Sequence, residues 1–391
     1  MSIAIEGCCH GELDQIYNSL LDKASRINQA LPDLLIICGD FQSVRNELDL
    51  NCISMPIKYR KLGDFQSYYT GVKKAPLMTI FIGGNHEASN YLQELKFGGW
   101  VAPNIYYLGH SGCIWYKGLR ISGISGIWYP YDFSKPRLEK LPYDQNSIRS
   151  IYHVRKLDFL KQFLIKQPIS VMLSHDWPQG IENYGNLNRL LRFKPFFQKD
   201  IISGKLGSPV NRILLSKLMP EYWFSAHLHV KFEAEVFHES SIKKRKNSLD
   251  KNENLELENT LDKCLPKRNF LELLHIPVTS TKHPSFIDNQ NLYWDKEYIA
   301  ITKVFHNMFI HTDYYKKLYK FEEIFNIDKD ILDELKREIN IEFEKLNEKS
   351  HDSFQINPNF FVKTANTDTT ELKEYENPQT TTFLSNFNIN Q

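Results

Sequence analysis

Side chains that can bind divalent metal ions recur at five places in this sequence. These places are Cys8-x-His10, Gly39-Asp40, Gly84-Asn85-His86-Glu87, His175 and His227-x-His229. A divalent ion needs several oxygen, nitrogen or sulfur ligands in a fixed geometry, which no single residue supplies. One histidine or one Gly-Asp turn is common in any protein. Five such groups in one chain together predict a metal centre.

The spacing of these groups suggests two metal positions. If Cys8 and His10 lie on an extended segment, both side chains point the same way and can face one ion, and the same holds for His227 and His229. Asp40 could bridge two ions with its two carboxylate oxygens. Two ions roughly 3.5–4 Å apart would stabilise the attacking and leaving oxygens of an in-line phosphoryl displacement.

An α/β fold is expected to position these groups, because each follows an apolar run that predicts a buried strand. A helical apolar stripe from Leu13 to Ile27 follows the first of these strands. In layered α/β folds, ligands bind beyond the carboxyl ends of the strands. The five groups are therefore expected to meet at one site. The predicted strands are 2–6, 34–38, 77–82, 169–173 and 222–225.

Composition excludes several classes of protein. The 391 residues include 48 Lys and Arg against 47 Asp and Glu, so the net charge of +1 excludes a polycation or an acidic-tail protein. An apolar fraction of 42% permits a large core. No apolar run is long enough for a membrane span, and no secretion signal is expected at the N-terminus. Six cysteines without a C-x-x-C motif fit a reducing compartment.

The character of the sequence changes near residue 239. A basic run, Lys243-Lys244-Arg245-Lys246, is either a nuclear import signal or part of a solvated linker. Asn and Thr are frequent after residue 350, where little apolar periodicity remains. The predicted regions are a catalytic domain at 1–238, a linker or insertion at 239–262, a C-terminal domain at 263–350 with a helix at 328–348, and a disordered low-complexity tail at 351–391.

The order of the motifs resembles the calcineurin-like metallophosphoesterase superfamily, whose pattern is D-x-H, G-D, G-N-H-E, H and G-H-x-H. Cys8 stands where the first Asp is expected, and Ala226 replaces the Gly before the last H-x-H. With Cys8 in that place, residues 6–14 are similar to the RNA lariat debranching enzymes. Further stretches similar to that family are 39–42, 83–90, 98–109, 148–155, 173–178, 223–232 and 262–266.

This resemblance implies a four-layer αββα sandwich and hydrolysis of the 2′–5′ phosphodiester at the branch point of excised intron lariat RNA. It implies two divalent metal positions holding Fe²⁺, Zn²⁺ or Mn²⁺; the soft thiolate of Cys8 favours Fe²⁺ or Zn²⁺ over Mg²⁺. His86 is implied as the acid that protonates the leaving oxygen. The implied ligands are Cys8, His10, Asp40 and His229 at one position, and Asp40, Asn85, His175 and His227 at the other.

Residues 128–156 correspond to the lariat recognition loop of that family. The loop carries six Lys and Arg against three Asp and Glu, with aromatic residues between them. Cations contact phosphates and aromatic rings stack on bases, although some of the rings are expected to belong to the core. The candidate RNA contacts are Tyr129, Tyr131, Lys135, Tyr143, Arg149, Tyr152, His153 and Arg155.

Two other functions remain open from the sequence. One is another phosphoesterase, either a phosphatase or a DNA nuclease, which the 128–156 loop and Cys8 disfavour. The other is a scaffold without catalysis that binds RNA on the same fold, which the complete set of ligands disfavours. Branched intron RNA is the expected partner, and the expected location is the nucleus, with the cytoplasm as a second location.

Overall fold

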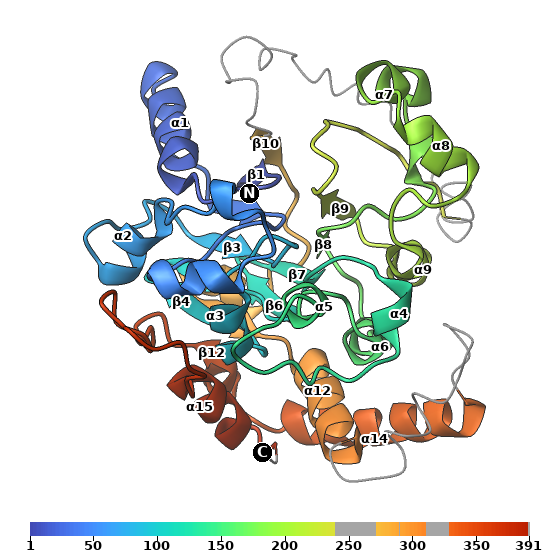
Figure 1. The fold of residues 1–391 in the computed structure, drawn as a ribbon. Helices are drawn as coiled ribbons and strands as arrows, with labels where there is room; N and C mark the ends of the chain where they lie inside the picture. Colours follow the sequence, from blue (N-terminus) through green and yellow to red (C-terminus); the bar gives the residue numbers. More distant parts are fainter. Residues whose placement is uncertain (239–270, 289, 310–327, 390–391) are drawn as a thin grey trace.

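Two six-stranded sheets form the centre of the protein (Figure 1). The computed structural model describes residues 1–238, 271–288, 290–309 and 328–389. In spatial order, the first sheet contains β10 (Glu272–His275), β1 (Ser2–Glu6), β2 (Leu34–Ile37), β3 (Thr79–Phe81), β5 (Ile105–Tyr107) and β4 (Gly99–Ala102). The second contains β12 (Gln355–Ile356), β11 (Leu292–Trp294), β6 (Ser111–Tyr116), β7 (Leu119–Ile124), β8 (Val171–Ser174) and β9 (Tyr222–Ser225).

The strands that precede the predicted ligands run parallel within each sheet. β1, β2 and β3 are parallel neighbours, and so are β8 and β9. Their carboxyl ends therefore open at a common edge. All five strands were predicted, and β1 and β9 have the predicted bounds.

Alternation of side chains along the strands produces the predicted four layers. In β1, Ile3 and Ile5 pack between the two sheets, whereas Ala4 packs with the helices outside. The outer helices of the first sheet are α1 (Leu13–Arg26), α2 (Phe65–Thr70) and α3 (Ser89–Glu94). Those of the second are α6 (Lys156–Phe163), α9 (Pro209–Leu218), α12 (Lys296–Phe309) and α14 (Lys329–Asn347). The αββα prediction is confirmed, and α14 matches the predicted helix at 328–348.

Short helices connect these layers. They are η1 (Glu47–Cys52), η2 (Ile57–Tyr59), α4 (Pro130–Phe133), α5 (Ser147–Ser150), η3 (Ile181–Tyr184), α7 (Leu187–Phe193), α8 (Phe197–Ile202), α11 (Pro284–Ile287), η4 (His351–Phe354) and α15 (Pro378–Asn386). Among the described helices, none combines the length and the apolar character that crossing a bilayer requires.

The C-terminal part of the chain completes both sheets. β10 pairs with β1, so that Ser2 lies opposite His275, and β11 pairs with β6. The buried guanidinium of Arg120 on β7 also binds Asp295 through Nη2 and Oδ1 at 2.6 Å. Paired charges of this kind satisfy each other inside the core. The predicted linker at 239–262, with its basic run, lies outside the described residues.

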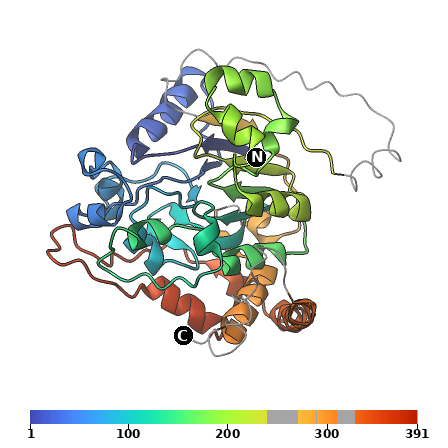
Figure 2. The same cartoon turned by 45° about the vertical axis from the view of Figure 1, so that its right-hand side comes forward.

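The prediction of a disordered tail at 351–391 is wrong for the residues described. Residues 351–389 include η4, β12 and α15, and α15 lies at the lower edge of the molecule in Figures 1 and 2. The tail lacks a periodic apolar pattern because most of it is an extended path that buries isolated side chains. The buried apolar side chains are Phe354, Ile356, Ala365, Phe383, Leu384, Phe387 and Ile389.

Polar contacts join this tail to the first sheet and to the segments that cover it. The side chain of Gln379 pairs with the open edge of β4. It accepts from the Trp100 N–H at 2.7 Å and donates to the Trp100 C=O at 2.9 Å. Arg45 Nη1 donates to Thr364 Oγ1 at 2.9 Å, and Tyr69 OH donates to the Ala365 carbonyl at 2.8 Å. The tail is thus part of the packed structure.

We expect the substitution Phe383→Ala to destabilise the whole protein. Phe383 is 6% exposed and packs against Phe97, Trp294 and Phe387. Loss of a buried phenyl ring costs about 3–5 kcal/mol, so the thermal unfolding midpoint measured by circular dichroism should fall by several degrees. Ser385→Ala, at an exposed position on the same helix, is the control and should leave it unchanged. Equal midpoints for the two variants would contradict a packed tail.

Candidate metal centre

Four predicted ligands meet at the carboxyl ends of the strands. One ligand atom from each of Cys8, His10, Asp40 and His229 lies within 4.8 Å of the other three. His10 Nε2 is 3.1 Å from His229 Nε2, and His10 Nδ1 is 3.8 Å from Asp40 Oδ2. Sulfur, imidazole and carboxylate at such distances form a donor set that suits a divalent transition metal.

The remaining three predicted ligands lie on the other side of Asp40. His175 Nε2 is 3.4 Å from Asp40 Oδ1 and 3.2 Å from Asn85 Oδ1. The rings of His175 and His227 have centroids 5.0 Å apart. Because Oδ2 faces His10 and Oδ1 faces His175, the two oxygens of Asp40 point to two different donor groups. This arrangement fits the bridging geometry predicted for Asp40.

The backbone at the ligands differs from the extended conformation that the sequence suggested. His10, Asp40, His227 and His229 have φ angles of 50°, 47°, 64° and 49°. These values lie in the left-handed region, which is sparsely populated by residues other than glycine and costs free energy. The chain turns sharply at each of these residues, so tight turns bring the ligands together and the i, i+2 alternation of a strand does not.

Two glycines allow the ligands to approach one another. A Cβ atom on Gly39 would lie 2.2 Å from His175 Nδ1, and one on Gly84 would lie 2.2 Å from Asp40 Oδ1. Both distances are far below van der Waals contact. The glycine before Asp40 and the glycine before Asn85 are therefore required by the close packing of the donor groups.

Neighbouring groups fix the orientation of the ligands. The Nδ1–H of His175 donates to the Cys38 carbonyl at 2.7 Å, which leaves Nε2 free to face a metal. The buried Glu87 carboxylate accepts from Phe41 N–H at 2.7 Å and from Gly84 N–H at 3.0 Å. It therefore joins the two loops that carry Asp40 and Asn85. Burial raises the pKa of Glu87 to about 8. Its position beside His86 was the one available signal for this role.

The protonation states of the donors fit a divalent cation. Burial lowers the pKa of His10 to about 4 and also lowers the pKa of His175 and His229, so these imidazoles are in the neutral form that binds metals. Burial raises the pKa of Asp40, but the nearby histidines outweigh it and hold that pKa below its usual value. Burial, with the charge of Asp40, raises the pKa of Cys8, so a thiolate there requires a neighbouring cation.

His86 lies beside the donor groups but its ring is held by other atoms. The His86 backbone N–H donates to Asp40 Oδ1 at 2.8 Å, and its ring Nδ1 donates to the Ser54 carbonyl at 2.9 Å. The ring centroid is 6.1 Å from that of His10. Since Nδ1 is occupied, Nε2 is the atom available to a substrate. No sequence pattern could identify Ser54, because its carbonyl makes the contact.

His227 connects the centre to the 128–156 loop. Its backbone N–H donates to Cys8 Sγ at 3.3 Å, and its Nε2 is 3.7 Å from Asp176 Oδ1. Asp176 also accepts from the Trp128 N–H at 2.6 Å, and burial raises its pKa to about 6. The sequence placed Asp176 within a motif but gave it no role. In the structure it joins the start of the loop to a predicted metal ligand.

The candidate RNA contacts divide into exposed and internal groups. Tyr129, Tyr131 and Arg149 are exposed, and Lys135 is exposed while pairing with Asp132 at 2.9 Å. Tyr143 is half-buried. The four exposed side chains can reach a bound polymer without rearrangement of the loop.

His153, Arg155 and Tyr152 make contacts within the protein. His153 is buried, with Nδ1 at 2.7 Å from Asp132 Oδ2, and stacks on Tyr129 at 4.7 Å. Arg155 is buried and donates to the Asp132 carbonyl at 2.7 Å, which gives it a position inside the loop. The hydroxyl groups of Tyr152 and Ser54 lie 3.3 Å apart, so Tyr152 lies close to the residue that holds His86.

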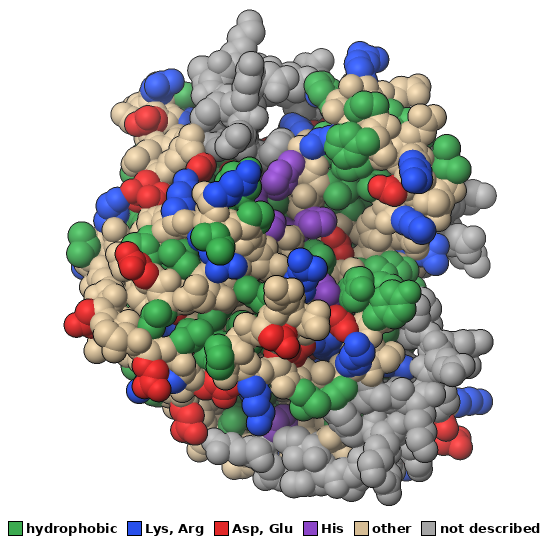
Figure 3. Space-filling view, in the orientation of Figure 1, with side chains coloured by type: hydrophobic (Ala, Val, Ile, Leu, Met, Phe, Trp, Pro, Cys, Tyr) green, Lys and Arg blue, Asp and Glu red, His purple; other side chains and the backbone are tan. Residues whose placement is uncertain are grey.

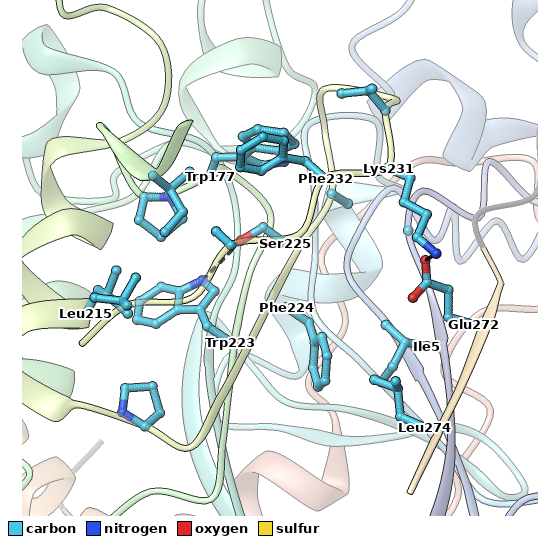
Figure 4. Close-up of a pocket in the computed structure, with 18 of the residues that line it drawn as sticks. Ile5, Trp177, Leu215, Trp223, Phe224, Ser225, Lys231, Phe232, Glu272 and Leu274 are labelled. Atoms are coloured by element: carbon cyan, nitrogen blue, oxygen red, sulfur yellow. Dashed lines mark hydrogen bonds and ion pairs between the residues drawn. The ribbon is translucent and has the colours of Figure 1, made fainter. Parts of the chain in front are cut away.

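A cavity of about 270 Å³ adjoins the metal centre between the edges of the two sheets. Cys8 and His229 line one end, while β9 lines one side and β1 with β10 the other (Figure 4). Lys231 Nζ pairs with Glu272 Oε1 at 2.9 Å beside this cavity. This ion pair therefore joins the loop after β9, which carries His227 and His229, to β10.

Comparison with known proteins agrees with this geometry. The family described as calcineurin-like phosphoesterase matches residues 1–231, and the lariat debranching enzyme C-terminal domain matches residues 260–391. A protein from Saccharomyces cerevisiae named lariat debranching enzyme is 45% identical over 339 residues, covering 76% of this chain and 82% of its own length. A Xenopus laevis protein, lariat debranching enzyme A, is 42% identical over 400 residues, covering all of this chain and 70% of its own.

The length of the match varies between relatives. The lariat debranching enzyme of Danio rerio is 50% identical over 308 residues, which cover 79% of this chain and 52% of the fish protein. The chain thus spans about half the length of that relative. The two family matches and these identities lead to one assignment. The chain belongs to the lariat debranching enzyme family of calcineurin-like phosphoesterases.

Proposed function

We propose that this protein hydrolyses the 2′–5′ phosphodiester bond at the branch point of excised intron lariat RNA. The observation that carries the proposal is Cys8 within an otherwise complete donor set. A thiol replaces the carboxylate that the wider superfamily has at this place. The two relatives from Xenopus laevis and Saccharomyces cerevisiae, which match most or all of this chain, are named lariat debranching enzymes. Divalent ions bound there would neutralise charge on the phosphate and lower the pKa of the attacking water.

His86 is the proposed proton donor to the leaving 2′ oxygen. Its Nδ1 is held by the Ser54 carbonyl, so Nε2 can carry the transferred proton toward the substrate. Asn85 offers a neutral amide beside His175, and its NH₂ group can donate to a phosphate oxygen while Oδ1 faces a metal. Cleavage of the 2′–5′ bond places negative charge on the 2′ oxygen, and an alkoxide is a poor leaving group. The leaving 2′ oxygen therefore needs this proton.

For the metals, we propose Fe²⁺ or Zn²⁺ at the position that includes Cys8, with Mn²⁺ as the alternative. Thiolate ligands favour these softer ions over Mg²⁺. Four imidazoles and a bridging carboxylate complete a set of borderline donors, since His10 and His229 lie on the side of Cys8 and His175 and His227 lie on the other.

The substrate is proposed to enter the hollow in which histidines are visible in Figure 3. Lys and Arg side chains lie around this hollow, and Tyr129 and Tyr131 are exposed on the 128–156 loop. Rings stack on unpaired bases and cations contact phosphates, which suits the unpaired nucleotides around a branch.

The proposed location is the nucleus, which the run Lys243-Lys244-Arg245-Lys246 supports. Substitution of all four residues by Gln in a fluorescent fusion should reduce nuclear accumulation. Unchanged accumulation would remove the support that this run gives.

The purified protein with Mn²⁺ should cleave a 2′–5′ branched RNA and leave a linear 3′–5′ RNA of the same sequence intact. His86→Ala should lower the rate of branch cleavage by about 10²–10⁴-fold, the usual contribution of a general acid. Its metal content, measured by atomic emission, should stay near that of the wild type, because the His86 ring is held by Ser54 and not by the donor set.

His175→Ala is the matched comparison, since it should lose both cleavage and metal. Cleavage of the linear RNA would favour a general nuclease, and no cleavage with any divalent metal would favour a scaffold. Loss of metal from His86→Ala would show that His86 is a ligand and would contradict its proposed role.

We expect Cys8→Asp to shift the metal preference. A carboxylate binds harder ions better than a thiolate does, so the ratio of Zn²⁺ to Mn²⁺ affinity should fall by roughly tenfold or more. Competitive titration with a metal-sensitive dye measures this ratio. Cys113→Ala, which removes a buried thiol from β6, should leave it unchanged. An unaltered ratio in Cys8→Asp would show that the thiol does not contact the metal.

A further inference from the structure

The segment 186–219, which contains α7, α8 and α9, is strongly basic in a chain that is nearly neutral. It carries seven Lys and Arg against one Asp, whereas the whole chain has a net charge of +1. Arg189, Arg192 and Lys199 are exposed, and Lys194 is half-exposed. Within the described residues, no ion pair involves these four side chains. We call the exposed outer face of α7 and α8 the basic lobe.

Aromatic rings lie among the cations of the basic lobe. Phe193 and Phe196 are 63% and 66% exposed, and the Lys194 Nζ lies 5.8 Å from the centroid of the Phe196 ring. By contrast, the next residue, Phe197, is 6% exposed. Exposed apolar side chains that lie together can mark an interaction site, whereas single ones are common on protein surfaces. The lobe thus presents cations and flat apolar faces alternately over a short stretch of chain.

The inner face of the lobe packs on the loop that carries two metal ligands. Leu190, Phe197 and Leu206 form a small core with Trp177, and Leu228 and Val230 pack against it on either side of His229. Trp177 stacks on Phe232 at 5.2 Å, as Figure 4 shows. The lobe is therefore fixed beside the centre and is not an independent appendage.

The packing of Leu228 and Val230 against the core of the lobe places the lobe next to His229. In Figure 3, the hollow with the histidines lies next to the upper right part of the molecule, where Figure 1 shows α7 and α8 in the same orientation. One wall of the hollow is thus the basic lobe, and Trp128, at the start of the 128–156 loop, is joined to the same centre through Asp176.

We propose that the basic lobe binds one single-stranded arm of the branched RNA. A branch has three arms, and only one can follow each wall away from the reacting phosphate. Unpaired RNA offers alternating phosphates and base faces, which match the alternation of Arg189, Arg192, Phe193 and Phe196. This proposal rests on the proposed function for the identity of the RNA, and it adds a second contact surface outside the 128–156 loop.

Binding measured on the His86→Ala background tests the lobe without turnover. The double substitution Arg189→Gln with Arg192→Gln should reduce the slope of log affinity against log salt by about 1.4, since each phosphate contact to a single strand contributes about 0.7. Phe193→Ala should weaken binding about fivefold or more through lost stacking. Fluorescence anisotropy of a labelled branched RNA measures both effects.

A matched control removes two exposed arginines elsewhere, with Arg26→Gln on α1 and Arg337→Gln on α14. This variant has the same net charge as the lobe variant, and its slope should equal that of the parent. All variants should keep the parent thermal midpoint, because the substituted side chains are exposed.

Shortening the arms of the RNA one at a time identifies the arm. The difference between lobe variant and parent should vanish when one particular arm is removed and persist when either of the others is. Equal slopes and affinities for the lobe variant, Phe193→Ala and the control would overturn the proposal. Cleavage by the wild-type protein is measured separately, so an inactive wild type would refute the proposed function and leave the binding result interpretable.

Discussion

The position of the Asp40 carboxylate is the constraint on which the rest of the site depends. Its two oxygens face two different sets of donors, so a small displacement would separate both from their partners. Its backbone is left-handed at φ 47°, and both neighbouring turns are tied by the buried Glu87. Glycines at 39 and 84 remove the side chains that would block this arrangement. Packing therefore holds a conformation that the local sequence alone would disfavour.

The sequence predicts the position of the site in the fold more accurately than the backbone geometry that forms it. Apolar runs that stop at Asp40, Asn85, His175 and His227 are a strong signal, because parallel strands deliver their carboxyl ends to one edge. The turn geometry had no signal, since His10 and His229 adopt left-handed angles only in the tertiary context. The contact between His86 and the Ser54 carbonyl is equally invisible, because any residue has that carbonyl.

Tertiary context also explains why the packing of the tail and the presence of the basic lobe were not predicted from the sequence. The tail has few periodic apolar residues, yet Phe383 and Phe387 are buried against Phe97, in the turn after α3, and Trp294 on β11. Periodicity detects regular elements and misses extended segments that use one anchor at a time. The role of the basic lobe could not be predicted from the sequence for a different reason. Arg189 and Phe193 lie on a short amphipathic helix, and nothing in the sequence reveals that its apolar face covers the loop containing His229.

The two walls of the hollow contact the predicted metal ligands or their neighbours in the chain. Trp128 reaches His227 through Asp176, and the α7–α8 core packs around Leu228. A bound polymer that displaces either wall would therefore also displace residues next to the donor set. Such coupling links the correct seating of a large substrate to the geometry of a few atoms.

Pairing of Met1 and Ser2 with a strand near residue 275 has a consequence for synthesis on the ribosome. The N-terminal amino group donates to the Ile276 carbonyl across 275 positions of chain, and β11 closes β6 still later. Until those residues emerge, β1 presents an open row of amide and carbonyl groups along the edge that β10 later occupies. Contacts of such high sequence separation form slowly. During synthesis, the edges of both sheets therefore stay unpaired until the C-terminal strands are made. Unpaired edges of this kind can associate with other chains, and they are the surfaces that chaperones protect.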